Sequence, residues 1–411
     1  MECDVTKVYH RTFDSNFFFE NGRSIIMLDS YVQIDLTKLK NNARAILSKY
    51  PQYKNYIAVV KGDAYGHSMQ AVKALHEGGI NYFAVSSLEE AKDFRKVLPD
   101  VPLLYLEPVD KDRMGEAQDL KLTLGICDME HLKMVLAYKT DYSFNLHLQI
   151  DAGFNRLGFN DKDQIKKAVD MICDSQHNLQ GVYQHFATAG IFDPHYDNQI
   201  RKFKELLSLV DLSAISMVHL GSGVSLLGHP KIDIANTIRM GLVVYGYNIG
   251  PQSYGGGIKN KLRQMRDNRN RKKYNLTPTI TDVQIDLSPA FEYKCRILQL
   301  KKVKAGEYVG YGASYKALSD ITLAILPVGY NNGIGHANNS RYVQIGDSLY
   351  PIVGEIGMNM CAVKVSDSVK LSDEVTLLGG KITLGAFCRG ANLSLAEALV
   401  SVGKNNEKKY I

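Results

Sequence analysis

A lysine stands at the end of a short apolar run near the start of the chain. The run from Tyr56 to Val60 has the length of a buried strand, and Lys61 follows it directly, ahead of a glycine-containing segment typical of a loop. A lysine at the C-terminal end of a strand can be desolvated, which lowers its pKa and suits it to Schiff-base chemistry. The ordinary alternative is a solvated lysine, so the rest of the chain must supply what a reactive one needs.

Further polar or small residues lie next to later apolar runs of the same kind: Arg156, His185 and Ser222 follow such runs, and Arg239 and Gly241 stand at the start of the last one. Ser222 lies between two glycines, in a loop whose backbone N–H groups can hold a phosphate. A lysine, a phosphate loop, arginines and an imidazole are together the groups that pyridoxal phosphate needs. Taken singly, these residues are also explained as salt-bridge partners, a hydrogen-bonded histidine and a helix cap.

A regular alternation of strand-like and helix-like segments positions these residues. The strand-like runs are residues 57–60, 82–85, 103–106, 122–126, 146–150, 181–183, 216–220 and 242–245. Helical patterns lie between most of them; Ser87 to Arg95, for example, opens with a capping serine and glutamate. Eight near-equal repeats predict a (β/α)8 barrel, a TIM-type barrel, over residues 31–249, with its active site at the C-terminal strand ends. A doubly wound sheet is the alternative.

The remaining segments divide into three parts. Residues 284–411 show short alternating runs punctuated by glycine, which predict a C-terminal mainly-β domain, with a helix at 394–402. The strand expected at 31–36 belongs either to the barrel or to this β domain. Residues 1–30 form an N-terminal extension, and residues 250–283 are expected to be a basic linker or insertion.

Composition describes an ordinary globular protein. Of the 411 residues 45% are hydrophobic and 22% charged, and no apolar run reaches the roughly 18 residues that a membrane-spanning helix needs. We therefore expect a cytoplasmic protein with no membrane partner. The six cysteines are scattered, so neither a metal site nor a disulfide framework is expected.

Most of the net charge of +6 lies in one stretch. Residues 259–273 hold eight lysines and arginines against Asp267. A charge run of this kind is usually a solvated loop, and binding of nucleic acid or an acidic partner is the minor interpretation. No aromatic residue interleaves with the charges, as a surface that stacks bases would require.

The chain resembles the alanine racemase family, barrel-type pyridoxal-phosphate enzymes with a C-terminal β domain. The resemblance runs from about residue 31 to about residue 399. The segments that carry it are 59–67, 151–158, 185–187, 239–241, 310–315, 329–330 and 354–359. It implies that the protein racemises amino acids with pyridoxal 5′-phosphate as cofactor.

The resemblance assigns the cofactor to seven residues: Lys61, Tyr65, Arg156, His185, Ser222, Arg239 and Gly241. Lys61 would hold the cofactor covalently and act as one base. Tyr65 and Ser222, with the backbone at Gly241, would hold the phosphate. Arg239 would bond the pyridine nitrogen, and because an arginine is always protonated it could not give that nitrogen a proton.

The same resemblance implies a homodimer with shared active sites. Arg156 would orient the phenolic oxygen and the substrate, and His185 would lie against the cofactor ring. Tyr311 would come from the partner subunit as the second base, with Tyr330 and the Met358 backbone completing the pocket for a small amino-acid substrate. Two bases on opposite faces of a planar intermediate are what racemisation requires.

Departures from the family pattern bear on the substrate. Gln149 stands where many relatives carry a carbamylated lysine, Asn359 replaces a carboxylate of the substrate loop, and Leu395 lies near the position of a narrowing tyrosine. We therefore expect activity on alanine and on serine. The alternatives are a racemase of a larger amino acid, a barrel-type decarboxylase and a non-catalytic pyridoxal-phosphate-binding protein. The residues after Cys361 lack the aspartate of the decarboxylases, and the segment around Tyr311 argues against the non-catalytic class.

Overall fold

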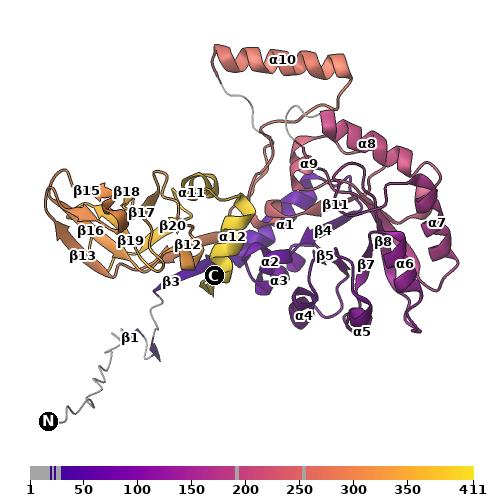
Figure 1. Ribbon diagram of the computed structural model, residues 1–411, viewed down its shortest axis with the longest axis horizontal. Coiled ribbons are helices and arrows are strands. Elements are labelled where there is room, and N and C mark those ends of the chain that lie inside the picture. Colours follow the sequence, from indigo (N-terminus) through magenta and orange to yellow (C-terminus); the bar gives the residue numbers. More distant parts are fainter. Residues whose placement is uncertain (1–18, 21–22, 25–28, 190–193, 252–255) are drawn as a thin grey trace, which may run out of the picture.

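The structure, a computed structural model, describes residues 19–20, 23–24, 29–189, 194–251 and 256–411. Figure 1 shows a barrel of strands and helices beside a domain built mainly of strands, with one helix standing apart from both. Two short strands, β1 (Phe19–Glu20) and β2 (Arg23–Ser24), form a hairpin near the N-terminus. Over the described part of the chain, no helix has the length and apolarity to cross a bilayer.

Eight parallel strands form the barrel, in the spatial order β10-β9-β8-β7-β6-β5-β4-β11. They are β4 (Asn55–Val59), β5 (Tyr82–Val85), β6 (Leu103–Tyr105), β7 (Thr123–Ile126), β8 (Asn145–Gln149), β9 (Asn178–Tyr183), β10 (Met217–His219) and β11 (Thr237–Met240). The two end strands meet where the N–H of Asn236 donates to the Val218 carbonyl at 3.1 Å. The (β/α)8 barrel expected from the sequence is thereby confirmed in a nearly closed form.

Helices cover the outside of the barrel (Figure 1): α1 (Leu36–Lys49), α3 (Met69–Glu77), α4 (Leu88–Val97), α5 (Met114–Asp119), α6 (Met129–Leu136), α7 (Lys162–Cys173) and α8 (Pro194–Leu206). Helix α4 shows why they form. Ser87 caps it by accepting from the Glu90 N–H at 3.1 Å, and Leu88, Ala91 and Phe94 recur at helical spacing on its buried face. The remaining short helices of the barrel are α2 (Lys61–Tyr65), α9 (Gly223–Gly228), η1 (Lys111–Arg113), η2 (Leu212–Ala214) and η3 (Leu242–Tyr245).

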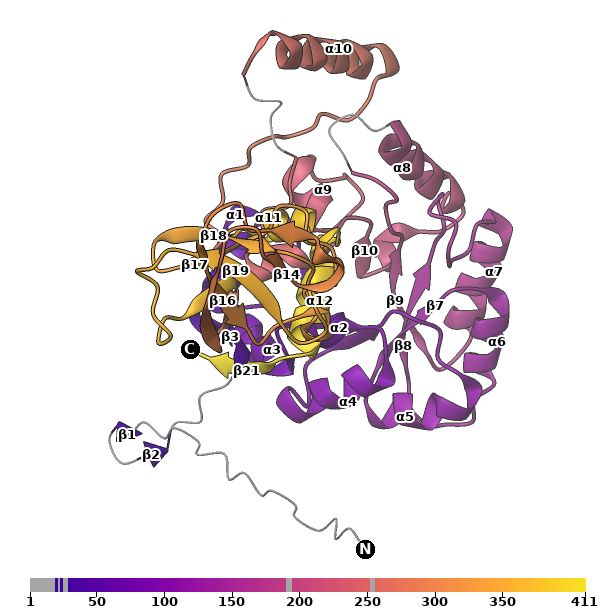
Figure 2. The same cartoon turned by 60° about the vertical axis from the view of Figure 1, so that its left-hand side comes forward.

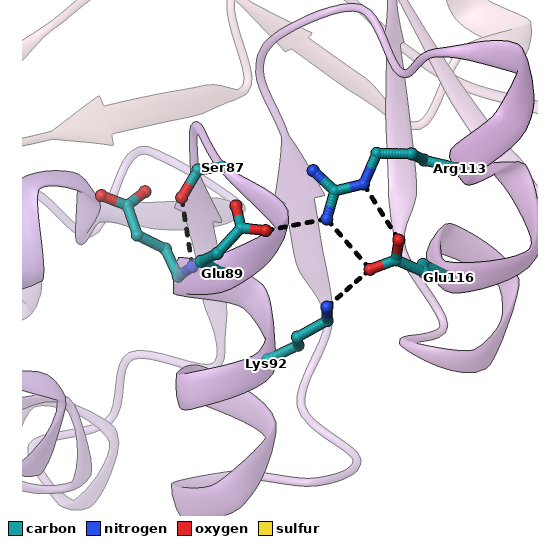
Figure 3. Close-up of polar contacts among 6 residues, drawn as sticks. Ser87, Glu89, Lys92, Arg113 and Glu116 are labelled. Carbon is teal, nitrogen blue, oxygen red and sulfur yellow. Dashed lines mark hydrogen bonds and ion pairs between the residues drawn. The ribbon is translucent and has the colours of Figure 1, made fainter.

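A surface ion network links α4 to η1 and α5 (Figure 3). Arg113 donates from Nε and Nη2 to the two carboxylate oxygens of Glu116, both at 3.0 Å, and from Nη2 to Glu89 at 2.8 Å. Lys92 lies 2.6 Å from the Glu116 carboxylate. These pairs hold the register of neighbouring helices, but because they face solvent they contribute little to stability.

The expectation for the eighth barrel strand was wrong. The strand is Thr237–Met240, and the apolar run at 242–245 forms the 3₁₀ helix η3 instead. Arg239 is inside β11 and 5% exposed, so a buried charge interrupts the apolar pattern of the true strand. Residues 243–245 are apolar because η3 itself is buried. Burial alone does not distinguish a strand from a buried turn.

The β domain contains a nine-stranded sheet in the order β13-β16-β19-β18-β17-β20-β12-β3-β21. Its strands are β3 (Ser30–Ile34), β12 (Phe291–Cys295), β13 (Gln299–Val303), β16 (Ile321–Leu326), β17 (Tyr342–Ile345), β18 (Ser348–Val353), β19 (Cys361–Val365), β20 (Val375–Leu378) and β21 (Glu407–Tyr410). A separate ribbon pairs β14 (Tyr308–Val309) with β15 (Tyr315–Lys316), flanking the 3₁₀ helix η4 (Tyr311–Ala313). The other helices are η5 (Tyr330–Asn332), α11 (Leu384–Ala391) and α12 (Leu395–Lys404).

Strand β3 lies in the sheet of the β domain, the second of the two placements that the sequence left open. It pairs antiparallel with β12 and parallel with β21, the last strand of the chain. The segment 250–283 also differs from a simple linker, because it contains the helix α10 (Ile258–Tyr274). In both views α10 stands away from the barrel and the β domain (Figures 1 and 2).

Candidate active site

Lys61 begins a short turn of unusual backbone conformation. Where a loop was expected, α2 follows β4, and Gly62, Asp63, Ala64 and Tyr65 have φ values of 67°, 54°, 54° and 53°. Three consecutive non-glycine residues in this left-handed region store strain, which persists only where surrounding contacts impose it.

Contacts from other elements impose that conformation. The Glu90 carboxylate accepts from the Gly62 N–H at 2.6 Å and from the Ser86 N–H at 3.0 Å. On the other side, Lys408 of β21 lies 3.2 Å from the Asp63 carboxylate. The last strand of the chain therefore helps to hold the turn that carries Lys61.

Helix α12 packs against the same turn through two glycines. A Cβ at Gly66 would lie 2.1 Å from the Leu399 carbonyl oxygen, and a Cβ at Gly403 would lie 2.4 Å from the Gly66 Cα. Gly66 also has a φ of 79°, so a side chain would be excluded there both by conformation and by space. The barrel and the β domain meet directly behind Lys61.

All seven residues expected to contact a cofactor line one cavity of about 460 Å³: Lys61, Tyr65, Arg156, His185, Ser222, Arg239 and Gly241. They come from segments that follow or end barrel strands, so the fold brings together residues separated by up to 180 positions along the chain. Lys61 itself is exposed in the single chain. The desolvation expected for it is thus not provided by this chain alone.

Arg239 is fixed by a buried hydrogen-bonded chain that runs through the barrel interior. Its Nη1 donates to His219 at Nδ1 (2.8 Å) and at the backbone carbonyl (2.7 Å), and its Nη2 donates to the Gln184 carbonyl. The chain continues from His219 Nε2 to His147 Nδ1 at 2.9 Å, and from His147 Nε2 to Gln180 Oε1 at 3.0 Å.

The arginine determines the tautomers of both histidines. Because Arg239 can only donate, His219 must accept at Nδ1 and carry its proton on Nε2. His147 then accepts at Nδ1 and donates from Nε2 to Gln180. Burial, followed by the nearby Arg239, lowers the pKa of His219 well below its usual value, and burial lowers the pKa of His147 to about 4. Both rings are therefore neutral at physiological pH.

A cradle in the same cavity combines Tyr65, Ser222 and glycine backbone. A Cβ at Gly241 would lie 2.8 Å from the Tyr65 hydroxyl, so only glycine leaves that hydroxyl its place. A Cβ at Gly221 would lie 2.6 Å from Ile238 Cδ1. Burial raises the pKa of Tyr65, which keeps its phenol a neutral donor. The cradle offers hydroxyl donors where a phosphate would bring acceptor oxygens.

Arg156 is positioned through its loop. The Asp151 carboxylate accepts from the Arg156 N–H at 3.1 Å and from the N–H groups of residues 153–155, and the guanidinium lies 4.3 Å from the centre of the Phe154 ring. Gln149 lines the same cavity as Arg156 and accepts from the Tyr183 hydroxyl at 3.0 Å. His185 is half-buried, and the centre of its ring lies 5.3 Å from the centre of the Phe154 ring. Burial, together with the positive charges of Arg239, Arg156 and Lys61, lowers the pKa of His185 to about 3.

The other four predicted residues lie on the β domain: Tyr311, Tyr330, Met358 and Asn359. Tyr311, Met358 and Asn359 line a second cavity of about 470 Å³, separate from the one that Lys61 lines. The Tyr330 N–H donates to the Gly357 carbonyl at 3.1 Å, which ties η5 to the same loop. Exposed fractions are 72% for Tyr311, 41% for Tyr330 and 56% for Met358. In the single chain these residues face solvent.

Sequence reasoning missed several residues that hold the site. His147, Gln180 and His219 were given no role. For His147 the signal was an imidazole at an alternate position in an otherwise apolar strand, residues 146–148 of β8. Glu90 was interpreted only as part of a helix cap, and its contact with Gly62 follows from the fold rather than from spacing.

The fold and the cavity together define a barrel enzyme with an attached β domain. Family models match two parts of the chain: "Alanine racemase, N-terminal domain" over residues 34–249 and "Alanine racemase, C-terminal domain" over residues 290–410. The chain belongs to the alanine racemase family.

Individual proteins agree with this assignment. An alanine racemase of Streptococcus pneumoniae (strain Hungary19A-6) is 28% identical over 348 residues, covering 84% of this chain and 87% of the relative. The crystal structure of a biosynthetic alanine racemase from Pseudomonas aeruginosa matches with a TM-score of 0.76 and 25% identity, covering 94% of this chain and 100% of that one. The crystal structure of alanine racemase from E. faecalis matches with a TM-score of 0.80 and 24% identity. The match covers 93% of this chain and 98% of that one, and it supports the fold.

Proposed function

We propose that the protein is a pyridoxal-phosphate-dependent racemase that interconverts L- and D-alanine and accepts serine as a second small substrate. One observation carries the proposal: a lysine, two arginines, an imidazole and a hydroxyl-lined glycine cradle share one cavity at the C-terminal ends of the barrel strands. The family relationship supports the same reaction.

The residues fit the cofactor. Tyr65, Ser222 and the backbone at Gly241 would bind its phosphate, and Lys61 would bind it covalently. Three of the five N–H groups of Arg239 are used by His219 and Gln184, and no side chain or carbonyl of the described residues accepts from the other two. Burial lowers the Arg239 pKa to about 10, so it stays a cation at neutral pH and meets a ring nitrogen only as a donor.

Two bases would move the proton. Pyridoxal phosphate, when bound, supplies the electron withdrawal that lets the substrate Cα release its proton. Lys61 would act on one face of the substrate and Tyr311 on the other, because inversion at Cα requires removal and return from opposite sides. Arg156 would orient the substrate from the loop that Asp151 holds.

The working form would be a homodimer. Tyr311 is 72% exposed and lines a cavity on the β domain, whereas Lys61 is exposed at the barrel mouth. A second copy that covered the barrel mouth with the Tyr311 loop would bury both side chains at once. It would also supply the desolvation that Lys61 lacks in the single chain. The cytoplasmic location expected from the sequence stays a prediction.

The substrate preference rests on Asn359, because Leu395 lines a cavity other than the two that contain the predicted site residues. An amide at 359 both donates and accepts, so it can pair with a serine hydroxyl without a fixed charge. One such hydrogen bond is worth about 0.5–1.5 kcal/mol, which broadens specificity without excluding alanine. Gln149, Tyr330 and Met358 would line the remainder of the pocket.

Incubation of the purified, cofactor-loaded protein with a panel of L-amino acids, followed by chiral chromatography, tests this proposal. We expect D-alanine and D-serine among the products. Racemisation of a larger amino acid with neither of these would overturn the substrate assignment. Release of an amine and carbon dioxide in place of a D-amino acid would overturn the reaction itself.

A further inference from the structure

Helix α10 (Ile258–Tyr274) is not explained by the proposed reaction. It is a 17-residue helix between the barrel and the β domain in the sequence, and it lies outside both in the structure. In Figures 1 and 2 it is the outermost element on its side, and its axis runs across the direction in which it projects. A flat surface could therefore contact α10 along its length before it touched the rest of the molecule.

One face of α10 is apolar at its N-terminal half and basic at its C-terminal half. Ile258, Leu262 and Met265 recur at helical spacing and are 81%, 60% and 61% exposed. Arg269 and Lys272 continue the same face by steps of four and three residues, and both are exposed. Large apolar side chains on a helix that faces solvent indicate a surface that is covered in use.

The charge of α10 is arranged around that face. Lys259, Lys261, Arg266 and Lys273 flank it and are exposed. The one acidic residue of the helix, Asp267, is 6% exposed and lies on the opposite side, two residues beyond Met265. The outward side of α10 therefore presents cations and apolar groups with its carboxylate turned away.

We propose that α10 is a docking helix for an anionic lipid surface. The three apolar side chains would enter the boundary between headgroups and acyl chains, while the lysines and arginines would pair with lipid phosphates. Neither part suffices by itself, because three side chains bury little area and surface charges are screened by salt. The two together form the combined signal that gives stable attachment of a surface helix.

The observations favour lipid over the other anionic partners. A nucleic acid offers phosphates but gives no use to the apolar residues on the outward face. The one aromatic residue of α10, Tyr274 at its C-terminal end, lies on the side of Asp267 and not among these residues. The sequence predicted no membrane partner because no apolar run is long enough to span a bilayer, a criterion that a helix lying on a membrane surface does not have to meet. Residues 258, 262 and 265 form a face only once the segment is helical.

Sedimentation with vesicles tests the proposal on the full-length, cofactor-loaded protein. The vesicles would contain phosphatidylcholine with about 30% phosphatidylglycerol, and phosphatidylcholine alone would serve as the neutral comparison. One variant replaces Ile258, Leu262 and Met265 by serine, and a second replaces Lys261, Arg269 and Lys272 by glutamine. A matched control replaces the exposed lysines Lys96, Lys121 and Lys304 by glutamine.

We expect the protein to bind the anionic vesicles and not the neutral ones, with binding that weakens as salt rises. The serine variant and the glutamine variant should each lose about tenfold or more in partitioning, and the control should lose less than about twofold. The activity of the free protein should be the same in all three variants, since none of the residues lines the active-site cavity.

Equal binding to neutral and anionic vesicles, or to neither, would overturn the proposal. The proposal would also be overturned if the serine variant bound the anionic vesicles as tightly as the parent and single-stranded RNA displaced the vesicles from the protein. That result would show that α10 binds polyanions in general. A third outcome combines two results: the parent protein does not bind vesicles, and light scattering shows that the serine variant has a different oligomeric state from the parent. That outcome would assign the apolar face of α10 to contact with a second copy of the chain.

Discussion

The barrel mouth and the Tyr311 loop differ in how far contacts within the single chain bury and hold their side chains. At the barrel mouth, Arg239 is 5% exposed and is held by a chain of buried imidazoles, and contacts from α12 and β21 fix the strained turn after Lys61. The Tyr311 loop instead exposes most of its tyrosine to solvent. The single chain thus preorganises the half of the site that would bind the cofactor and leaves the half that would supply the second base open.

Replacing Lys61 should have the largest effect. Lys61→Ala removes both the covalent attachment and one base, so we expect racemisation to fall by at least about a thousandfold. The purified variant should also lack the visible absorbance of a covalently bound cofactor. Lys96→Ala, which removes an exposed lysine of α4, is the matched control and should retain both. Wild-type absorbance in Lys61→Ala would show that the cofactor is held elsewhere.

Tyr311→Phe should distinguish the role of the Tyr311 loop in the reaction from the role of the barrel mouth in cofactor binding. It removes only the phenolic hydroxyl, so we expect a loss of kcat of about 10² to 10⁴ with the cofactor absorbance and the melting temperature unchanged. Tyr308→Phe changes another exposed tyrosine of the same ribbon and should leave activity within about twofold. A variant that lost cofactor along with activity would indicate that Tyr311 is part of the binding half.

Acid should weaken the barrel before the β domain. Burial lowers the pKa of His67 and of His147 to about 4, so each is neutral in the folded state at pH values where the unfolded chain is protonated. Their contribution to the free energy of unfolding is complete at a pH above the pKa of the unfolded chain, about 6.5, and it is lost as the pH falls toward 4. The loss is on the order of 3 kcal/mol for each histidine.

Hydrogen exchange can locate this loss. Amides of β8 and β10 should lose protection between pH 7 and pH 5, relative to amides of β16 and β19, after correction for intrinsic rates. The β domain contains one histidine, His336, which is exposed, so His336→Gln should leave the difference unchanged. His147→Gln should reduce it. Equal loss of protection in both domains would contradict this account.

The smallest effect is expected at Asn359. Asn359→Asp replaces the amide on the open half of the site by a carboxylate and should shift the ratio of kcat/KM values for serine and alanine toward alanine by less than about tenfold. The measurement is the two kcat/KM values with each L-amino acid. An unchanged ratio would remove Asn359 as the cause of serine acceptance.

The sequence predicts what local pattern and spacing determine. Seven barrel strands were found near their observed positions because each is a short apolar run between helical patterns. The eighth was misplaced because Arg239 interrupts β11. Strand β12 and helix α11 went unpredicted. The seven cavity residues could be named because the family resemblance assigns them to the cofactor, and each lies in a barrel strand or in the segment that follows one, where a barrel gathers side chains.

What could not be predicted depends on contacts between distant segments. No local pattern around Asp63 indicates its ion pair with Lys408, because the two residues are in different domains and far apart in the sequence. The tautomers of His147 and His219 follow from Arg239 only when the barrel brings the three together. For α10, a charge run was visible, but its apolar face needed the helix to become apparent.

Subunit complementation tests the central claim most directly. Lys61→Ala and Tyr311→Phe are each expected to be inactive as homodimers, but a mixed dimer would contain one site with both wild-type residues. Random exchange of subunits should restore about a quarter of the wild-type activity, because about half of the dimers are mixed and each has one intact site. Mixed dimers shown to form without any recovered activity would contradict the account, because each chain would then build its own site.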